Sequence, residues 1–335
     1  MHLIKPAIYG KTLLLLLIMS ALFILTGCSV DTESSNQSEP KQTESNTGKK
    51  QPKTIALVMK TLTNPFFVEM ERGARRAEKE LGIHLLVKTA AQETSIQQQI
   101  GIVEELIRNK VDAIVIAPGD SVELIPVLKQ AQDAGIIVIN IDNRLDPEFS
   151  KTVRLQNVPF ISVNNEQAAY LSAKTLTSQL SQPTSVAILE GIRGAANAED
   201  RKNGALRAFS EQPFAKVVAM ETAHWKIDEA YEVTKQLFAE YPEIKAIFCA
   251  NDMMALGAIQ YLQSTERNDV LVAAYDALEQ AKEAIRKGTL VSTVDQQAAE
   301  QGYQGIQFAH RALSGEELPS VILIDTRIIT RENVN

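Results

Sequence analysis

Polar and aromatic residues follow the apolar runs of this 335-residue chain. Each of these runs is typical of a buried strand, and the residues after them supply carboxylates, a guanidinium, carboxamides and aromatic rings. In chain order they are Asn64, Phe66, Phe67, Asp142, Arg201, Trp225, Asn251, Asp276 and Gln296. Carboxylates and amides pair with hydroxyl groups, and apolar ring faces pack on aromatic side chains. Any one of them could instead cap a helix, but the set predicts a binding site for a neutral, polyhydroxylated ring.

The first of these residues lie in the segment 54–67, TIALVMKTLTNPFF. Its apolar start predicts a buried parallel strand, and Asn64-Pro65 predicts a helix that begins at Pro65, because Asn caps helices and Pro suits the first turn. Phe66 and Phe67 are adjacent in that turn, so they cannot both face the sheet. We expect at least one ring to look out over the carboxyl end of the strand, where open α/β sheets bind ligands. The alternative is that both rings belong to the core.

Strands and helices alternate along the body of the chain. The expected strands read TIALVM, HLLVKT, DAIVIA, IIVINI, FISV, SVAILEG, VVAMETA, AIFCA, VLVAAYD and LVSTV. The expected helices lie near residues 65–81, 96–107, 122–134, 200–209, 228–241 and 297–313, with further helices starting near Glu166 and Asp252. This alternation predicts an α/β fold of two similar doubly wound domains, whose parallel sheets are covered by helices on both faces.

Charge and motifs argue against several classes of function. The formal net charge is −7, which is a poor electrostatic match to nucleic acid. No GxxxxGK[ST] or GxGxxG loop occurs, and the four histidines His2, His84, His224 and His310 lack the spacing of metal ligands. Asp142 and Asp276 could form an acid–base pair, yet among these neighbours we expect them to hold hydroxyl groups. We therefore predict no enzyme activity, no cofactor and no metal site, and expect His224 to lie at the surface or behind the site.

The amino-terminal segment has the features of an export signal. Lys5 and Lys11 precede the apolar stretch 13–25, which is shorter than the roughly 20 residues that span a bilayer. The stretch ends in Leu25-Thr26-Gly27-Cys28, which resembles the lipobox of bacterial lipoproteins. The resemblance implies a signal peptide over residues 1–27 and acylation of Cys28. The alternative is an ordinary exported protein with a cysteine at this position.

Residues 28–53 are almost entirely polar, so we expect a disordered tether between the lipid anchor and the folded body. Cys249, in the apolar run AIFCA, is the only other cysteine. With Cys28 carrying lipid, no disulfide is possible, and Cys249 is expected to be a small buried hydrophobic residue.

Several motifs together resemble the ribose-type periplasmic sugar-binding proteins, the substrate-binding components of ABC importers. The resemblance covers about residues 54–330 and rests on TLTNPFF, NID, GIRGAANAEDRKNG, ANDMMALGA, AAYDALEQA and VSTVDQQ. It implies a monomer with the type I periplasmic-binding-protein fold, in which three strands form a hinge between two lobes. The amino-terminal lobe would comprise residues 54–163 and 297–325, and the carboxy-terminal lobe residues 164–296 and 326–335. With the lipid at Cys28, the protein would be held on the extracytoplasmic side of a membrane.

The same resemblance implies roles for individual residues. Residues of the first domain would contact the sugar from one side, namely Asn64, Phe66, Phe67, Asp142 and Asn143. Residues of the second domain would contact it from the other side, namely Arg201, Trp225, Asn251, Asp276 and Gln296. Asn143 stands where the ribose proteins have arginine, Lys60 where a small serine is expected, and Trp225 in place of phenylalanine. These departures argue against simple transfer of ribose and leave open a hexose, a furanose form, a deoxy or amino sugar, or an inositol.

Two other functions share this fold. Transcriptional repressors of the LacI type carry a helix-turn-helix segment at the amino end, where this chain has a signal sequence and a tether. A sensory role is the alternative to import, since a sugar-bound closed form could dock on a chemoreceptor or sensor kinase instead of an ABC permease. We expect the permease to be the membrane partner.

Overall fold

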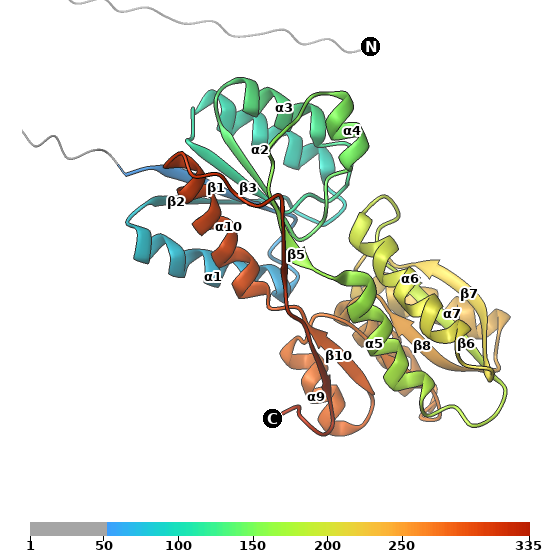
Figure 1. Ribbon diagram of the computed structural model, residues 1–335. Helices are drawn as coiled ribbons and strands as arrows, with labels where there is room; N and C mark the ends of the chain where they lie inside the picture. The colour runs from blue at the N-terminus through green and yellow to red at the C-terminus, as the bar shows by residue number, and fades with distance from the viewer. Residues whose placement is uncertain (1–51) are drawn as a thin grey trace, which may run out of the picture. The chain divides into compact units, whose positions relative to one another are not determined.

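The computed structural model describes residues 52–335 (Figure 1). The predicted signal peptide, the lipid attachment at Cys28 and nearly all of the predicted tether lie outside these residues. Two six-stranded sheets organise the described part of the chain. None of its helices combines the length and the apolar character that a membrane span requires.

The first lobe is built on a parallel sheet with the order β11-β5-β4-β3-β1-β2. Its strands are β1 (Thr54–Met59), β2 (His84–Thr89), β3 (Ala113–Ile116), β4 (Ile137–Ile141), β5 (Phe160–Val163) and β11 (Val321–Ile324). Its helices are α1 (Pro65–Leu81), α2 (Ile96–Arg108), α3 (Ile125–Asp133), α4 (Pro147–Thr152) and α10 (Ala298–Leu313). Strands β1 and β3 are almost completely buried, as expected for central strands covered on both faces.

The second lobe repeats this plan with the sheet order β12-β10-β9-β8-β6-β7. Its strands are β6 (Thr184–Glu190), β7 (Ala215–Thr222), β8 (Ile244–Cys249), β9 (Leu271–Ala273), β10 (Ser292–Asp295) and β12 (Arg327–Thr330). Its helices are α5 (Asn165–Thr177), α6 (Ala196–Ser210), α7 (Ile227–Glu240), α8 (Asp252–Ser264) and α9 (Glu279–Lys287). The predicted α/β class, with two similar parallel-sheet domains, is confirmed.

Three segments connect the lobes: β5 to α5, β10 to α10, and β11 to β12 (Figure 1). The last connection corrects the expectation of purely parallel sheets, because β12 pairs antiparallel with β10. The reason is the direction in which the chain enters the second sheet. Strand β10 ends at the connection and β12 begins there, with Arg327 opposite Asp295, so the two strands run in opposite directions.

Local signals account for the helix that carries the two phenylalanines. The Oδ1 atom of Asn64 accepts a hydrogen bond from the backbone N–H of Phe66 at 3.1 Å, and Pro65 occupies the first helical position. At the other end, Gly82 ends α1 with φ of 63°, a conformation that glycine adopts without steric cost. The predicted bounds of this helix, Pro65 to Leu81, are confirmed.

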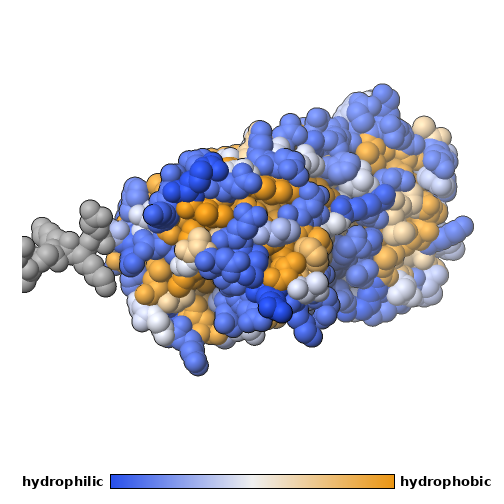
Figure 2. Space-filling view, turned by 90° about the horizontal axis from the view of Figure 1, so that it is seen from above, coloured by the Kyte–Doolittle hydropathy of each residue, from blue (hydrophilic) through white to orange (hydrophobic). Residues whose placement is uncertain are grey.

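Two short helices, α4 and α9, were not predicted. Helix α4 has no buried residue and therefore no apolar periodicity, although Asp146 caps it by accepting from the N–H of Phe149. Helix α9 buries Ala281, Ala284 and Ile285 on one face, but its nine residues are too few for the periodicity to be recognised in the sequence. On the surface, hydrophilic and apolar side chains are interspersed over the face seen in Figure 2.

Candidate ligand-binding site

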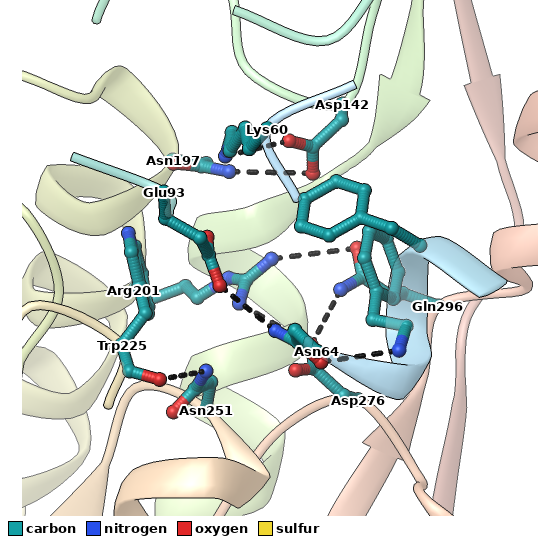
Figure 3. A pocket seen from close by; sticks show the side chains of 12 residues that line it. Lys60, Asn64, Glu93, Asp142, Asn197, Arg201, Trp225, Asn251, Asp276 and Gln296 are labelled. Carbon is teal, nitrogen blue, oxygen red and sulfur yellow. Dashed lines mark hydrogen bonds and ion pairs between the residues drawn. The ribbon is translucent and has the colours of Figure 1, made fainter. Parts of the chain in front are cut away.

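A cavity lies where the two lobes meet, and residues from both lobes line it (Figure 3). The space between the atoms that line it amounts to about 230 Å³, including any part that opens to solvent. The first lobe contributes Lys60, Asn64, Phe66, Phe67, Glu93 and Asp142, and the second contributes Asn197, Arg201, Trp225, Asn251, Asp276 and Gln296. None of these residues is more than 9% exposed, so the site is screened from bulk water.

The topology explains why these residues meet. Lys60, Asp142 and Asn251 come within two residues of the ends of β1, β4 and β8. The remaining lining residues lie in the connections that follow strands or in the first two turns of the helices after them. Because parallel strands end at the same edge of a sheet, each lobe presents its set at one edge. The cavity is formed where these two edges face each other.

Aromatic rings approach the cavity from both lobes. Phe66 and Phe67 pack edge to face, with ring centroids 5.1 Å apart, and both line the cavity as well as contributing to the core. The expectation that at least one of them looks toward the site is therefore met by both. Trp225 lines the cavity from the second lobe. A flat ring with apolar C–H faces suits such surroundings.

Two buried ion pairs lie in the wall. The Nζ atom of Lys60 is 2.8 Å from Oδ2 of Asp142, and each side chain is only 3% exposed. The guanidinium of Arg201 is 3.5 Å from Oδ1 of Asp276. Removing one partner of a buried pair leaves an uncompensated charge. Each of these four side chains therefore depends on its partner to be buried in the wall.

Arg201 is held rigidly in the second lobe. Its Nε donates to Oδ1 of Asn165 at 2.9 Å, and Nη1 donates to the carbonyl of Ala250 at 3.0 Å. Nη2 donates to Oε1 of Gln296 at 3.4 Å, and the guanidinium lies 3.8 Å from the ring centroid of Tyr275. A guanidinium fixed in this way presents its remaining N–H groups in one defined direction.

Several polar atoms of the wall have capacity left for a ligand. Among residues 52–335, Oδ2 of Asp142 (apart from its ion pair), Oδ1 of Asn197 and Nε1 of Trp225 are buried without a hydrogen-bond partner. Buried polar groups normally find partners, and each unpaired one costs about 1–3 kcal/mol. The set contains acceptors and a donor, so it matches hydroxyl groups, which both donate and accept.

The backbone is strained at three wall residues. Asp142, Trp225 and Asp276 have φ of 64°, 66° and 125°, which non-glycine residues rarely adopt. Such conformations cost on the order of 1–3 kcal/mol each and are concentrated at functional sites. Asp142 directly follows β4, and Trp225 and Asp276 each lie three residues beyond the ends of β7 and β9. All three side chains line the cavity.

Known proteins share this fold and much of this sequence. Residues 55–317 match the family model of the periplasmic binding protein domain. The D-ribose/D-allose-binding protein of Pseudomonas aeruginosa is 39% identical over 265 residues, which are 78% of this chain and 82% of that protein. The ribose import binding protein of Bacillus subtilis is 30% identical over 314 residues, 93% of this chain and 96% of that protein.

Among solved structures, an ABC transporter periplasmic solute binding protein of Actinobacillus succinogenes with bound D-allose aligns with a TM-score of 0.80 and 38% identity. The alignment covers 84% of this chain and 99% of that one. This chain belongs to the ribose-type periplasmic sugar-binding proteins. The resemblance inferred from its motifs is thereby confirmed, together with the type I periplasmic-binding-protein fold.

In this sugar-binding protein, nine of the ten predicted ligand contacts line the cavity. The tenth, Asn143, is fully buried but is not among the lining residues. Its Nδ2 donates to the carbonyl of Pro118 at 3.2 Å, and its Oδ1 accepts from the backbone N–H of Asn197 at 3.2 Å and from the hydroxyl of Ser121 at 3.4 Å. Asn143 thus connects the two lobes beside the cavity. The side chain of its neighbour Asp142, whose backbone has a positive φ, lines the cavity instead.

Three lining residues were not predicted as contacts: Lys60, Glu93 and Asn197. Lys60 directly follows β1, and Asn197 lies one helical turn before Arg201 on α6, so strand-end position and helical spacing could have indicated both. Glu93 lies in the loop between β2 and α2, four residues beyond the strand, and no sequence signal marks it.

Burial changes the proton affinity of two carboxyl groups in the wall. Oε1 of Glu93 accepts from Nδ2 of Asn64 at 2.9 Å, but burial raises the pKa of Glu93, against the opposing effect of Lys60. Burial likewise raises the pKa of Asp276 to about 7, although Arg201 and a hydrogen bond from Gln296 act in the other direction. Glu93 and Asp276 therefore take up protons more readily here than in water.

Two carboxamides of the site also stabilise local structure. Oδ1 of Asn251 caps α8 by accepting from the N–H of Met254, and its Nδ2 donates to the carbonyl of Trp225 at 3.3 Å. Nε2 of Gln296 donates to Oδ1 of Asp276 at 2.6 Å. Each amide nitrogen keeps one further N–H, so these residues both position their neighbours and retain a donor for a ligand.

Two other residues considered in the sequence analysis, His224 and Cys249, do not line the cavity. His224 is on the surface, where its Nδ1 lies 2.6 Å from Oε2 of Glu229, and it does not line the cavity. Cys249 is completely buried, and burial raises the pKa of its thiol, as expected for a small core residue. Within residues 52–335 no group of three or more His, Cys, Asp or Glu side chains is arranged to hold a metal ion.

Proposed function

We propose that this protein captures a neutral monosaccharide, D-allose or D-ribose, in the cavity between its lobes and delivers it to an ABC importer. The observation that carries the proposal is the wall itself. Aromatic rings and buried carboxyl groups come from both lobes, and unpaired hydrogen-bonding groups come from Asn197 and Trp225. The names of the relatives support the choice of sugar, since one is a D-ribose/D-allose-binding protein and another was solved with D-allose. The ten residues predicted from the sequence, except Asn143, are the proposed contacts, and we add Lys60, Glu93 and Asn197.

The charges of the wall favour a neutral ligand. Three carboxyl groups, of Glu93, Asp142 and Asp276, face only two cations, Lys60 and Arg201. Each cation already lies beside a carboxylate. A phosphate or carboxylate on the ligand would therefore meet no free positive charge, whereas hydroxyl groups can donate to the carboxylates.

Closure of the lobes is the proposed mechanism. Phe66 and Phe67 belong to one lobe and Trp225 to the other, so a ring can be enclosed on both sides only when the lobes meet. We place the lobe boundaries near residues 163, 296 and 325, where the three connections form a hinge of the kind by which periplasmic binding proteins close around ligands. Ligand then stabilises the closed form by its differential affinity for the two forms.

The closed form is what the ABC permease would recognise. We propose that the protein acts as a monomer without enzymatic activity on the extracytoplasmic side, held to the membrane by lipid on Cys28. Its relatives are binding proteins of import systems, which supports transport over the sensory alternative.

A thermal-shift and calorimetric panel tests the proposed ligand. The soluble body, from residue 52 onward, is titrated with D-allose, D-ribose, D-glucose, D-galactose, myo-inositol and D-glucuronate. A ligand at 100 times its dissociation constant should add roughly 2.7 kcal/mol of stability. We expect D-allose or D-ribose to bind best and D-glucuronate not to bind. Preference for the anionic sugar, or no stabilisation by any neutral one, would refute the proposal.

A further inference from the structure

The indole of Trp225 lies directly against Gly191, the residue that follows β6. A Cβ atom on residue 191 would be 2.0 Å from Cζ2 and 2.1 Å from Cη2 of Trp225, closer than non-bonded atoms can approach. The φ of Gly191 lies outside the left-handed region, so alanine could adopt its backbone conformation. Glycine is therefore required here for the space that the indole occupies.

Hydrogen bonds hold the backbone around these two residues together. The hydroxyl of Thr222 donates to the carbonyl of Gly191 at 2.6 Å, and the N–H of Ala223 donates to the carbonyl of Glu190 at 3.1 Å. These bonds join the end of β6 to the turn that carries Trp225. On the far side of that turn, Asn251 donates to the carbonyl of Trp225 at 3.3 Å. A side chain at 191 would have to displace the indole itself.

The cavity is the space into which the indole would move. Trp225 lines the cavity, and the guanidinium of Arg201 lies 5.4 Å from the centroid of its ring. The Nε1–H of Trp225 is buried and has no hydrogen-bond partner among the described residues, so no protein hydrogen bond holds the ring back. A methyl group at 191 would thus narrow the cavity from the side of the second lobe.

We infer that Gly191 is a positioning residue, which sets the place of Trp225 and with it the width of the cavity available to a ligand. The consequence for sugar affinity rests on the proposed function. The position of the indole does not, since Trp225 is the only tryptophan of the chain and its fluorescence reports its surroundings without any ligand.

The test compares Gly191→Ala, Trp225→Phe and the double variant with the wild type. Gly101→Ala is the matched control, because a Cβ at this exposed position of α2 would meet no atom within 4 Å. Gly191→Ala should shift the tryptophan emission of the sugar-free protein, whereas Gly101→Ala should not. Overpacking of this kind should weaken binding of D-allose or D-ribose by roughly tenfold or more. With the smaller phenylalanine ring at position 225, the same alanine should cost much less affinity.

The two measurements fail separately. If the wild type binds no sugar, the proposed function fails, while the emission shift still tests Gly191. If Gly191→Ala does not fold, the inference requires that adding Trp225→Phe restores folding, and an unfolded double variant overturns it. A tryptophan emission spectrum of Gly191→Ala that matches the wild type would also overturn the inference. So would a loss of affinity from Gly191→Ala that is equally large in the wild-type background and in the Trp225→Phe background.

Discussion

The ion pair between Lys60 and Asp142 offers a direct test of how the closed cavity is stabilised. Both side chains are 3% exposed, and both belong to the first lobe, so the second lobe completes their burial. In an open form, water would reach Asp142 and replace part of the electrostatic stabilisation that Lys60 gives to its carboxylate. The cost of removing Lys60 should therefore fall mainly on closure, and hence on ligand affinity.

The structure sets the expected magnitude for Lys60→Met, which keeps much of the side-chain volume. Removing one partner of a buried ion pair costs about 3–5 kcal/mol. We expect the lower end, because Nδ2 of Asn197 still donates to Oδ1 of Asp142 at 3.4 Å. At about 1.4 kcal/mol per factor of ten, sugar affinity should fall roughly 100-fold. The double variant Lys60→Met/Asp142→Asn removes both charges and should lose less than the two single variants together.

Isothermal titration calorimetry with the best sugar of the panel measures these affinities. Urea unfolding of each variant without sugar is the control, since a loss of folding stability as large as the loss of binding would point to the fold instead. An affinity of Lys60→Met within twofold of the wild type would refute the reasoning. So would single-variant losses that add fully in the double variant, because the two groups would then act independently.

Three further predictions concern pH, stacking and anchoring. Because burial raises the pKa of Asp276 to about 7, its contribution to folding stability is full below about pH 4 and is lost as the pH rises through 7. Asp276→Asn should therefore gain stability relative to the wild type between pH 4 and 7.5 in urea unfolding, and a pH-independent difference would contradict this. Trp225→Ala should weaken sugar binding, whereas Trp225→Phe should retain much of the affinity. If the tryptophan emission of the wild type does not change with any sugar that binds, Trp225 does not belong to the site. Cys28→Ser should release the protein from membranes without changing sugar affinity, an expectation that fails if mass spectrometry finds no acyl group on wild-type Cys28.

Local patterns were sufficient for most of the architecture. Helix α1 begins at Pro65 and ends at Leu81 because Asn64, Pro65 and Gly82 are cap and termination signals that act over a few residues. Strands such as β3 were predicted from apolar composition, which reflects burial on both faces of a parallel sheet. The antiparallel pairing of β12 was not predicted, since it depends on where the chain re-enters the second sheet.

The residues of the site likewise fall into those that could be predicted from the sequence and those that could not. Asp142, Trp225 and Asp276 could be predicted because the strands of each parallel sheet end at the same edge of that sheet, whatever the details of packing. Sequence position alone could not show that Asn143 turns toward Asn197 of the other lobe, because that direction follows from the strained backbone at Asp142.

The sequence by itself determined the α/β class, the family and most of the strand-end residues, since these depend on periodicity, caps and motifs that are local in the chain. Tertiary structure alone decided that Glu93 reaches the cavity, that Lys60 pairs with Asp142, and that Gly191 makes room for Trp225. These contacts join residues far apart along the chain or on different elements. Their distances are fixed only when the sheets and helices have packed, and contact distance is what decides electrostatic pairing and steric fit.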